Sequence, residues 1–209
     1  MDKANARQQV AALAARFQAQ KGRLKEEATK QGFILPLFQA LGWNTQDINE
    51  VAPEETASNG SVDYAFKIRG VSRFFLEAKK ARESLDKWTK KSIGYALHRG
   101  VDWLVLTNFS ELRLYYALGN TARLEQLLWK DLDCTDFERY FDDLWLLSKE
   151  SFQSGLIDEL ARKDGRLPRR QTLEVTLFSQ LQKWREKLVN DLLHWHNRSH
   201  PRPLTVEQA

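Results

Sequence analysis

The stretch VDYAFKIRGVSRFFLEAK, residues 62–79, decides the fold of this chain. Two alternating apolar runs flank a short break that contains a glycine, a pattern typical of a β-hairpin. If the turn centres near residues 70–71, Asp63 lies beside Glu77 and Ala78 on the facing strand. Glu77 and Lys79 are two residues apart, so their side chains point to the same face of the strand. The pattern therefore predicts two carboxylates and a lysine at one end of a hairpin.

This set of side chains has two interpretations. Two carboxylates beside a lysine can hold a divalent cation and a water for attack on a phosphodiester. The same residues can also be ordinary charges at an exposed strand end. The first interpretation is favoured because Phe74, Phe75 and Leu76 form a continuous apolar run before Glu77, as in a strand buried on both faces. An acid that ends a buried strand, opposite another acid, needs a reason to be there.

Amphipathic helices are predicted before the hairpin, over residues 3–21 and 23–41. Pro36 lies inside the second helix and should kink it or mark a new first turn, because proline has no backbone N–H to donate. Gly42 is a favourable residue to end that helix. Residues 44–61 are polar and contain proline and glycine, so a loop is expected there.

The residues after the hairpin predict a second pair of strands. A helix is expected over residues 86–99, a buried strand over 102–107 and a fourth strand over about 112–116. A hairpin, a crossover helix and a second hairpin make an α/β fold, which is a mixed sheet with helices packed on it. Beyond about Asp136 the pattern becomes helical.

The last predicted helix, over about residues 171–197, carries a long apolar stripe. Its members recur at spacings of four and three and are Leu173, Leu177, Leu181, Trp184, Leu188, Leu192 and Trp195. This stripe is long for one small sheet to cover. We therefore expect residues 136–200 to form a helical arm that packs partly against another domain, with the stripe otherwise bare or buried in a dimer. Residues 204–209 read as the start of a helix, as expected for a piece of a longer protein.

The composition limits the class of protein. The chain has 209 residues, with 32 Lys and Arg, 28 Asp and Glu and a net charge of +4, so any basic surface for an anionic partner must be local. No apolar run approaches the roughly 20 residues needed to span a bilayer, and the N-terminus lacks a signal-peptide pattern. Cys134 is the only cysteine, which excludes an intrachain disulfide and a cysteine-based zinc site. These features predict a cytoplasmic protein without a membrane partner.

Short segments along the chain match a known family in their order and spacing. They are EEAT at 26–29, FILPLF at 33–38, LGW at 41–43, VDYA at 62–65, LEAKK at 76–80, GYA at 94–96 and WLVLTN at 103–108. Together they resemble the N-terminal nuclease domain of type IIG and related type I restriction enzymes, which has the PD-(D/E)XK fold. The later segments FDDL at 141–144, LSKE at 147–150 and WRE at 184–186 resemble that family's helical connector to a methyltransferase domain. The resemblance implies a restriction-endonuclease-like nuclease domain over residues 1–135 and the connector over residues 136–209.

The resemblance also implies roles for particular residues. In such nucleases an acidic pair binds Mg²⁺, for which Mn²⁺ can substitute, and Asp63 and Glu77 would take that role. The Ala78 carbonyl would add a backbone oxygen ligand, since hard cations accept carbonyls. Lys79 would orient the attacking water and stabilise the transition state, because two nearby carboxylates tend to raise its pKa and disfavour a role as base. Glu26 would be an extra metal or water ligand, or else part of a solvated helix face.

The implied reaction is hydrolysis of phosphodiester bonds in double-stranded DNA by a Mg²⁺-dependent endonuclease. The enzyme class would be a type II-like, type IIG site-specific deoxyribonuclease, with methyltransferase and target-recognition domains of the full-length protein as its partners. The alternative is a noncatalytic nucleic-acid-binding or scaffold module that kept the fold. The presence of Asp63, Glu77 and Lys79 favours the nuclease, because a degenerate domain should have lost at least one of them.

Basic residues near the hairpin are candidate DNA contacts. Lys80, Arg82 and Lys91 can contact phosphates, which dominate DNA affinity. Many relatives carry a glutamine at the position of Lys91, so no DNA-contacting glutamine is assigned here, and Lys91 either contacts phosphate or is solvated. The family's proline before the first aspartate is absent as well. Weak, nonspecific and salt-sensitive DNA binding is expected.

Overall fold

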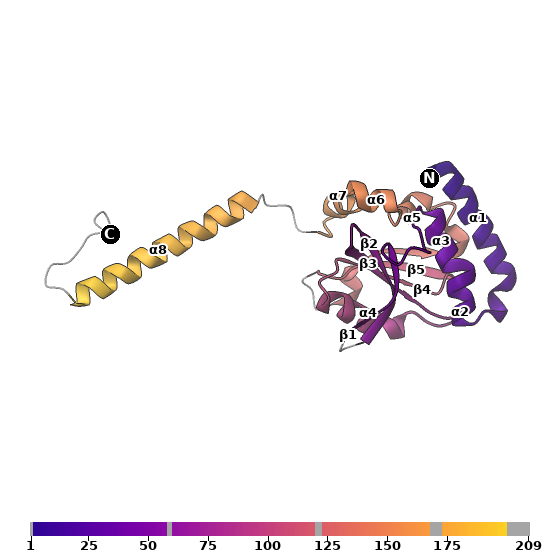
Figure 1. The fold of residues 1–209 in the computed structure, drawn as a ribbon, viewed down its shortest axis with the longest axis horizontal. Coiled ribbons are helices and arrows are strands. Elements are labelled where there is room, and N and C mark those ends of the chain that lie inside the picture. The colour runs from indigo at the N-terminus through magenta and orange to yellow at the C-terminus, as the bar shows by residue number, and fades with distance from the viewer. Residues whose placement is uncertain (1, 58–59, 120–122, 168–172, 200–209) are drawn as a thin grey trace. The chain divides into compact units, whose positions relative to one another are not determined.

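The computed structural model describes residues 2–57, 60–119, 123–167 and 173–199. The chain divides into two compact units, residues 1–167 and 168–209 (Figure 1). The first unit holds a sheet with helices around it, and the described part of the second unit is one long helix.

The strands of the described residues form one mixed sheet in the order β1-β2-β3-β4-β5-β6. They are β1 (Val51–Ala57), β2 (Gly60–Ile68), β3 (Val71–Ala78), β4 (Trp103–Thr107), β5 (Glu111–Tyr116) and β6 (Leu128–Asp133). Neighbouring strands run antiparallel except β3 and β4, which run parallel. Parallel neighbours need a crossover connection, and α4 (Asp86–His98) provides it. The predicted α/β fold is confirmed.

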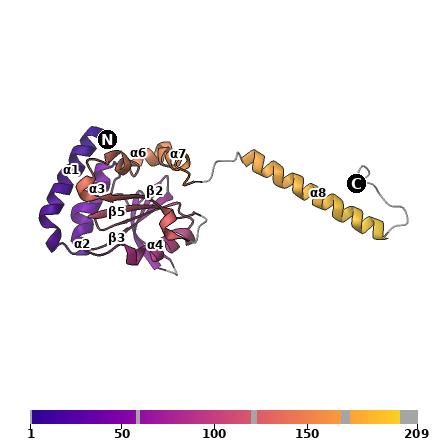
Figure 2. The same cartoon turned by 180° about the vertical axis from the view of Figure 1, so that it is seen from behind.

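Helices cover both faces of this sheet (Figures 1 and 2). One face shares a core with α1, α3 and α5 to α7, and the other shares a core with α4 and the short turn η3. The bounds of these elements are α1 (Lys3–Gln20), η1 (Lys21–Arg23), α2 (Glu26–Thr29), η2 (Lys30–Ile34), α3 (Leu35–Ala40), η3 (Leu124–Leu127), η4 (Cys134–Asp136), α5 (Phe141–Trp145), α6 (Lys149–Ser154) and α7 (Leu156–Lys163). The helix predicted over residues 23–41 corresponds to α2, η2 and α3.

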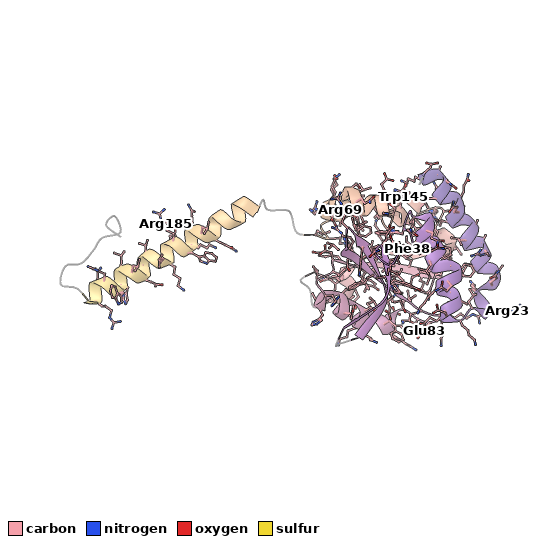
Figure 3. The ribbon with its side chains drawn as sticks, viewed as in Figure 1. Arg23, Phe38, Arg69, Glu83, Trp145 and Arg185 are labelled. Carbon is pink, nitrogen blue, oxygen red and sulfur yellow. The ribbon has the colours of Figure 1, made fainter. Side chains whose placement is uncertain are left out.

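The apolar run of β3 is buried on both faces, as the sequence predicted. Phe74 points into the first core and stacks on Phe66, with 4.2 Å between the ring centroids. Phe38 packs on this pair from α3, deep among the side chains of the first unit (Figure 3). Phe75 points into the opposite core, where its ring lies 5.4 Å from that of Tyr95. Packing on both faces makes the end of β3 a firm support for the polar residues that follow it.

The helical segment over residues 26–40 changes its winding in the middle, at the π turn η2. Pro36 cannot donate to the carbonyl of Gly32, and this carbonyl instead accepts a hydrogen bond from the Arg16 guanidinium. The irregularity predicted at Pro36 is therefore confirmed. Gly42 follows the helix with a φ of 93°, in the left-handed region that suits a glycine C-terminal stop.

Three local predictions are wrong. Residues 44–61 contain β1 rather than a continuous loop, and Pro53 is tolerated within it because β1 is an edge strand. Strand β6 was not predicted, because its charged residues leave too few apolar residues for a clear alternating pattern. The hairpin turn lies at residues 69–70 rather than 70–71. Both turn residues have positive φ, 52° and 78°, as a two-residue turn of type I′ requires.

The predicted boundary between residues 135 and 136 does not divide the compact units, which separate after Leu167. Beyond Asp136 the described chain is helical, as expected. However, α5 to α7 place Phe141, Phe152 and Ile157 in the core that this face of the sheet shares with α1 and α3. The nuclease and connector roles assigned to the two ranges stay predictions.

The second unit contains α8 (Leu173–Ser199), close to the predicted range 171–197. Large apolar side chains along its described part are exposed, namely Leu181, Trp184, Leu188, Leu192 and Trp195. What packs on this stripe stays a prediction, and the helix start predicted at residues 204–209 lies outside the described residues. Within the described ranges, no helix is both long and apolar enough to cross a membrane.

Candidate active site

Asp63 lies where the backbone pairing of β2 and β3 ends. The last paired residues at this end are Tyr64 and Leu76. Two residues further along β3, the Ala78 N–H donates a hydrogen bond to Asp63 Oδ2, with a distance of 2.7 Å. The carboxylate of Asp63 thus takes the place of a backbone acceptor. The hairpin pattern predicted this neighbourhood of Asp63 correctly.

Glu77 and Lys79 form a buried ion pair on one face of the strand. Lys79 Nζ lies 2.7 Å from Glu77 Oε1, and each residue is only 6% exposed. The Lys79 ammonium also lies 4.0 Å from the centroid of the Trp88 ring of α4. The Lys79 N–H donates to the Thr107 carbonyl over 2.8 Å, which ties the residue to β4. Burying such a pair costs free energy that an apolar pair would not, so its presence points to function.

Burial and the charges around Glu77 shift its pKa in opposite directions. Burial raises the pKa of Glu77 above its ordinary value, and the negative charge of Asp63 raises it further. The hydrogen bond from Lys79 and the positive charges of Lys79 and Lys91 lower it. Two carboxylates near enough to perturb each other in a buried place are a favourable position for a cation.

Lys30 is a member of this site that the sequence reasoning missed. Its ammonium lies 2.5 Å from Asp63 Oδ1 and 3.2 Å from Glu26 Oε1, and its side chain is only 11% exposed. Burial lowers the pKa of Lys30, but the hydrogen bond and charge of Asp63, joined by those of Glu26, outweigh burial and raise it. The spacing of four residues from Glu26 was the available signal, since such pairs meet on a helix face. We call Glu26, Lys30, Asp63, Glu77 and Lys79 the hairpin corner.

The donor atoms of the hairpin corner fit a hard cation by their chemistry. Carboxylates and a backbone carbonyl are the ligands that Mg²⁺ prefers, and the Lys30 ammonium shows that Asp63 and Glu26 already share one positive charge. Within the described residues, no three or more His, Cys, Asp or Glu side chains are gathered closely enough to hold a metal ion. A metal would therefore need Lys30 and the carboxylates to rearrange.

Exposed basic side chains lie around the hairpin corner. Lys80, Arg82 and Lys91 are exposed, and the effect of Lys91 on Glu77 places its charge near the carboxylates. The Arg82 side chain lies beside Gly22 of η1. If Gly22 carried a Cβ atom, that atom would lie only 2.9 Å from Arg82 Nη2. The exposed residues Lys21 and Arg23 belong to that same turn.

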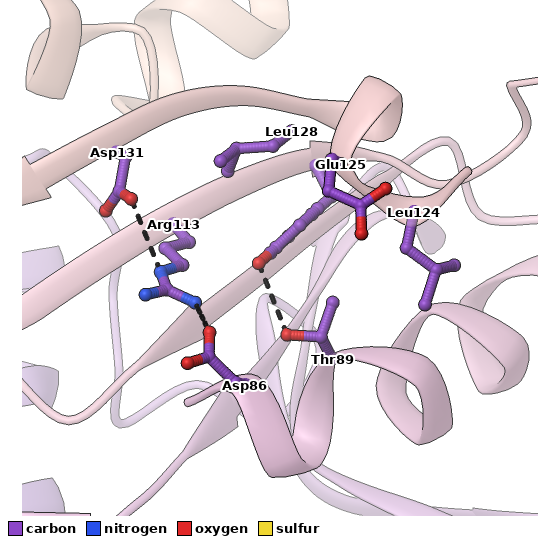
Figure 4. Close-up of a pocket in the computed structure, with 8 residues that line it drawn as sticks. Asp86, Thr89, Arg113, Leu124, Glu125, Leu128 and Asp131 are labelled. Atoms are coloured by element: carbon purple, nitrogen blue, oxygen red, sulfur yellow. Dashed lines mark hydrogen bonds and ion pairs between the residues drawn. The ribbon is translucent and has the colours of Figure 1, made fainter. Parts of the chain in front are cut away.

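A second charged group lies on the sheet at a pocket of ≈ 400 Å³ (Figure 4). Arg113 of β5 lies 2.5 Å from Asp86, 3.1 Å from Glu111 and 3.5 Å from Asp131. We call these four residues the Arg113 cluster. No residue of the hairpin corner lines this pocket, and the three acids around Arg113 are exposed, so it is not the candidate active site.

Residues 4–163 match the model of the family described as the MmeI N-terminal domain. Among solved structures, the chain is similar to one in the cryo-EM structure of a DrdV–DNA complex, with 17% sequence identity and a TM-score of 0.44. This similarity covers 68% of the present chain and 13% of the other, so the present chain spans a small part of that protein. No curated protein matches the chain significantly.

Proposed function

Because the chain belongs to the MmeI N-terminal domain family, the nuclease domain of type IIG restriction enzymes, we propose that it cleaves double-stranded DNA with the help of Mg²⁺. The observation that carries this proposal is the meeting of Asp63, Glu77 and Lys79 at the end of one hairpin. Glu77 and Lys79 are buried there, at a cost to stability that a purely structural role does not explain.

The carboxylates are proposed to hold the metal. Asp63 and Glu77 would be its side-chain ligands, the Ala78 carbonyl a backbone ligand, and Glu26 an additional ligand from α2. Bound Mg²⁺ would supply Lewis-acid polarisation of the phosphate. Asp63 is already oriented by its hydrogen bond from the Ala78 N–H. This bond links the two strands that carry the proposed ligands.

Lys79 is proposed to act on the water and on the transition state. Its ammonium is held between Glu77 and the Trp88 ring, so its position is fixed before substrate arrives. A fixed positive charge stabilises the negative charge that develops on the phosphate as water attacks. The ion pair with Glu77 holds the ammonium in place, so orientation of the water is the role proposed for Lys79.

The basic side chains around the corner are proposed to hold the DNA backbone. Lys80 and Arg82 extend from the end of the hairpin, Lys91 from α4, and Lys21 and Arg23 from η1. Phosphate contacts of this kind give affinity without sequence readout. Sequence recognition is therefore assigned to target-recognition and methyltransferase domains elsewhere in the full-length protein.

One observation favours the alternative of a noncatalytic module. Both acids of the hairpin are already paired with lysines, Asp63 with Lys30 and Glu77 with Lys79. Such a charge-balanced cluster is stable without metal and could remain after catalysis was lost. The two functions make different predictions. A nuclease cleaves DNA and depends on Lys79 to do so, whereas a noncatalytic module does not cleave DNA.

The deciding experiment is plasmid cleavage by the full-length enzyme with Mg²⁺, with Mn²⁺ and with EDTA. We expect cleavage with either metal, none in EDTA, and none by the Lys79→Ala enzyme. Lys130→Ala is the matched control, because Lys130 also pairs with an acid, Asp143, at 2.6 Å but on β6. Cleavage at the wild-type rate by the Lys79→Ala enzyme would rule out this active site, and absence of cleavage by the wild type would favour the noncatalytic module.

A further inference from the structure

We propose that Lys30 is a built-in counter-ion, which occupies the cation position between Asp63 and Glu26 in the metal-free protein and leaves it when a divalent ion binds. This role of Lys30 rests on the proposed function, because it concerns the same carboxylates. It assigns to the protein an exchange of an internal cation for an external one.

The first argument is that Lys30 uses the oxygens that a metal would need. Its ammonium contacts Asp63 Oδ1 at 2.5 Å and Glu26 Oε1 at 3.2 Å, while Asp63 Oδ2 accepts the Ala78 N–H. A Mg²⁺ ion sits about 2.1 Å from each ligand oxygen. An ion on Asp63 Oδ1 would therefore lie within about 5 Å of the ammonium. Two positive groups that close repel strongly in a site shielded from water, and this repulsion favours departure of the lysine.

The second argument is that the metal-free corner needs a cation. The Asp63 carboxylate accepts a hydrogen bond from the N–H of Ala78, the residue that follows Glu77, so the two acids lie close together. Lys79 balances Glu77, and Lys30 balances Asp63 and Glu26. Without Lys30, the Asp63 side chain, which is only 18% exposed, would have no cation beside its Oδ1 atom. Lys30 therefore maintains the arrangement of the ligands until metal arrives.

The third argument is that Lys30 has somewhere else to go. Glu27 Oε2 lies 4.0 Å from the ammonium, and the Glu27 side chain is 71% exposed. The lysine can pair with Glu27 at the surface by rotating its own flexible stem, without any movement of the backbone. Lys30 is also the first residue of the π turn η2, and such turns occur often at functional sites.

The test measures metal binding without DNA, so that no cleavage is involved. Calorimetry with Mn²⁺ compares the wild-type chain with Lys30→Met, which keeps the length of the stem but removes the charge. Lys130→Met is the control, since it removes a partly buried lysine from a different ion pair. We expect Lys30→Met to bind Mn²⁺ about tenfold more tightly than wild type, because a competing positive charge near the ion is gone. Lys130→Met should bind as wild type does.

Thermal unfolding gives the second readout. In EDTA the Lys30→Met chain should melt below wild type, and added Mn²⁺ should raise its melting temperature more than it raises that of wild type. Lys30→Gln should behave in the same way if Lys30→Met fails to fold. Equal or weaker Mn²⁺ binding by the folded Lys30 variants would overturn the exchange.

The wild-type protein offers a third readout. Acetylation of Lys30 by an amine-reactive reagent, measured by mass spectrometry, should be slow in EDTA and several-fold faster with saturating Mg²⁺, relative to Lys130. Protection of Lys30 that Mg²⁺ leaves unchanged would also overturn the exchange. If wild type and variants all bind no metal, both the exchange and the metal-dependent function fail. If Lys30→Met binds metal as wild type does and the full-length enzyme still needs Mg²⁺ to cleave DNA, only the exchange fails.

Discussion

The hairpin corner and the Arg113 cluster both gather acids around a basic side chain on the same sheet, yet they differ in burial. In the Arg113 cluster the three acids are well exposed, with side chains of Asp86, Glu111 and Asp131 that are 77%, 41% and 48% exposed. In the hairpin corner the Glu77 and Lys79 side chains are each 8% exposed. Water screens the first group, and the second is held in a poorly solvated place.

This difference separates a structural role from a functional one. An exposed ion pair contributes little and costs little, so the Arg113 cluster is explained as an ordinary link between α4, β5 and β6. A buried set with several acids is expensive to maintain, and it persists where a reaction needs perturbed groups.

Lys79→Ala in the full-length enzyme should reduce DNA cleavage by at least about 10²–10³-fold, because a fixed positive charge at the transition state is lost. Metal binding should remain, since Lys79 acts on the water rather than on the ion. Initial rates of plasmid nicking and Mn²⁺ calorimetry measure the two effects. Arg113→Ala should cut at the wild-type rate, and equal losses in both variants would erase the distinction between the two charged groups.

Asp63→Ala should lose both metal binding and cleavage, and it should also destabilise the metal-free protein. Repulsion from Glu77 alone would make the substitution stabilising, but it removes the nearest acid partner of Lys30 and leaves the Ala78 N–H without its acceptor. A loss of about 1–3 kcal/mol of unfolding free energy is expected, measured by denaturant unfolding in EDTA. Asp63→Asn keeps an acceptor for Ala78 and should lose less. A more stable Asp63→Ala protein would mean that repulsion dominates the corner.

Lys80→Ala and Arg82→Ala should each weaken nonspecific DNA binding by this chain and reduce its salt dependence. Each lost phosphate contact lowers the slope of log K against log salt by about 1. Fluorescence anisotropy with duplexes of unrelated sequence, at several salt concentrations, provides the measurement. Lys163→Ala is the control, because Lys163 pairs with Glu159 on α7. Binding that does not weaken with added salt, or that distinguishes strongly between DNA sequences, would argue against phosphate contacts by Lys80 and Arg82.

Arg113→Met should change stability by no more than about 1 kcal/mol, the usual range for pairs with exposed acids. The hydrogen bond from Arg113 holds the pKa of Asp86 below its ordinary value. An acid whose pKa is lower in the folded protein than in the unfolded chain stabilises the fold at pH values above its ordinary pKa. This stabilisation is lost as the pH falls through the lowered pKa of the folded protein. The difference between wild type and Arg113→Met should therefore shrink in mild acid, as urea unfolding at several pH values will measure. A difference that grows in acid would contradict this account of the cluster.

Short-range patterns explain why so much of the fold was predictable. The β2–β3 hairpin was predicted from alternation and a glycine, and its register follows from a turn of two residues. The kink at Pro36 follows from one missing N–H. In contrast, β1 and β6 are edge strands of the sheet, with weaker apolar patterns because each has a neighbour on one side only. The helical patterns of α5 to α7 do not reveal which surface these helices cover, so the packing that extends the first compact unit to Leu167 depends on tertiary contacts.

The candidate site likewise has one part that was predictable from the sequence and one part that was not. The meeting of Asp63, Glu77 and Lys79 follows from local sequence, since strand alternation over a short hairpin leaves these residues few other positions. The place of Lys30 between Asp63 and Glu26 follows from tertiary packing instead. The contact of Lys30 with Asp63 spans 33 residues and depends on how the segment of α2 and η2 packs beside the open end of the hairpin. No local periodicity encodes that packing, because it follows from the shape of the whole core.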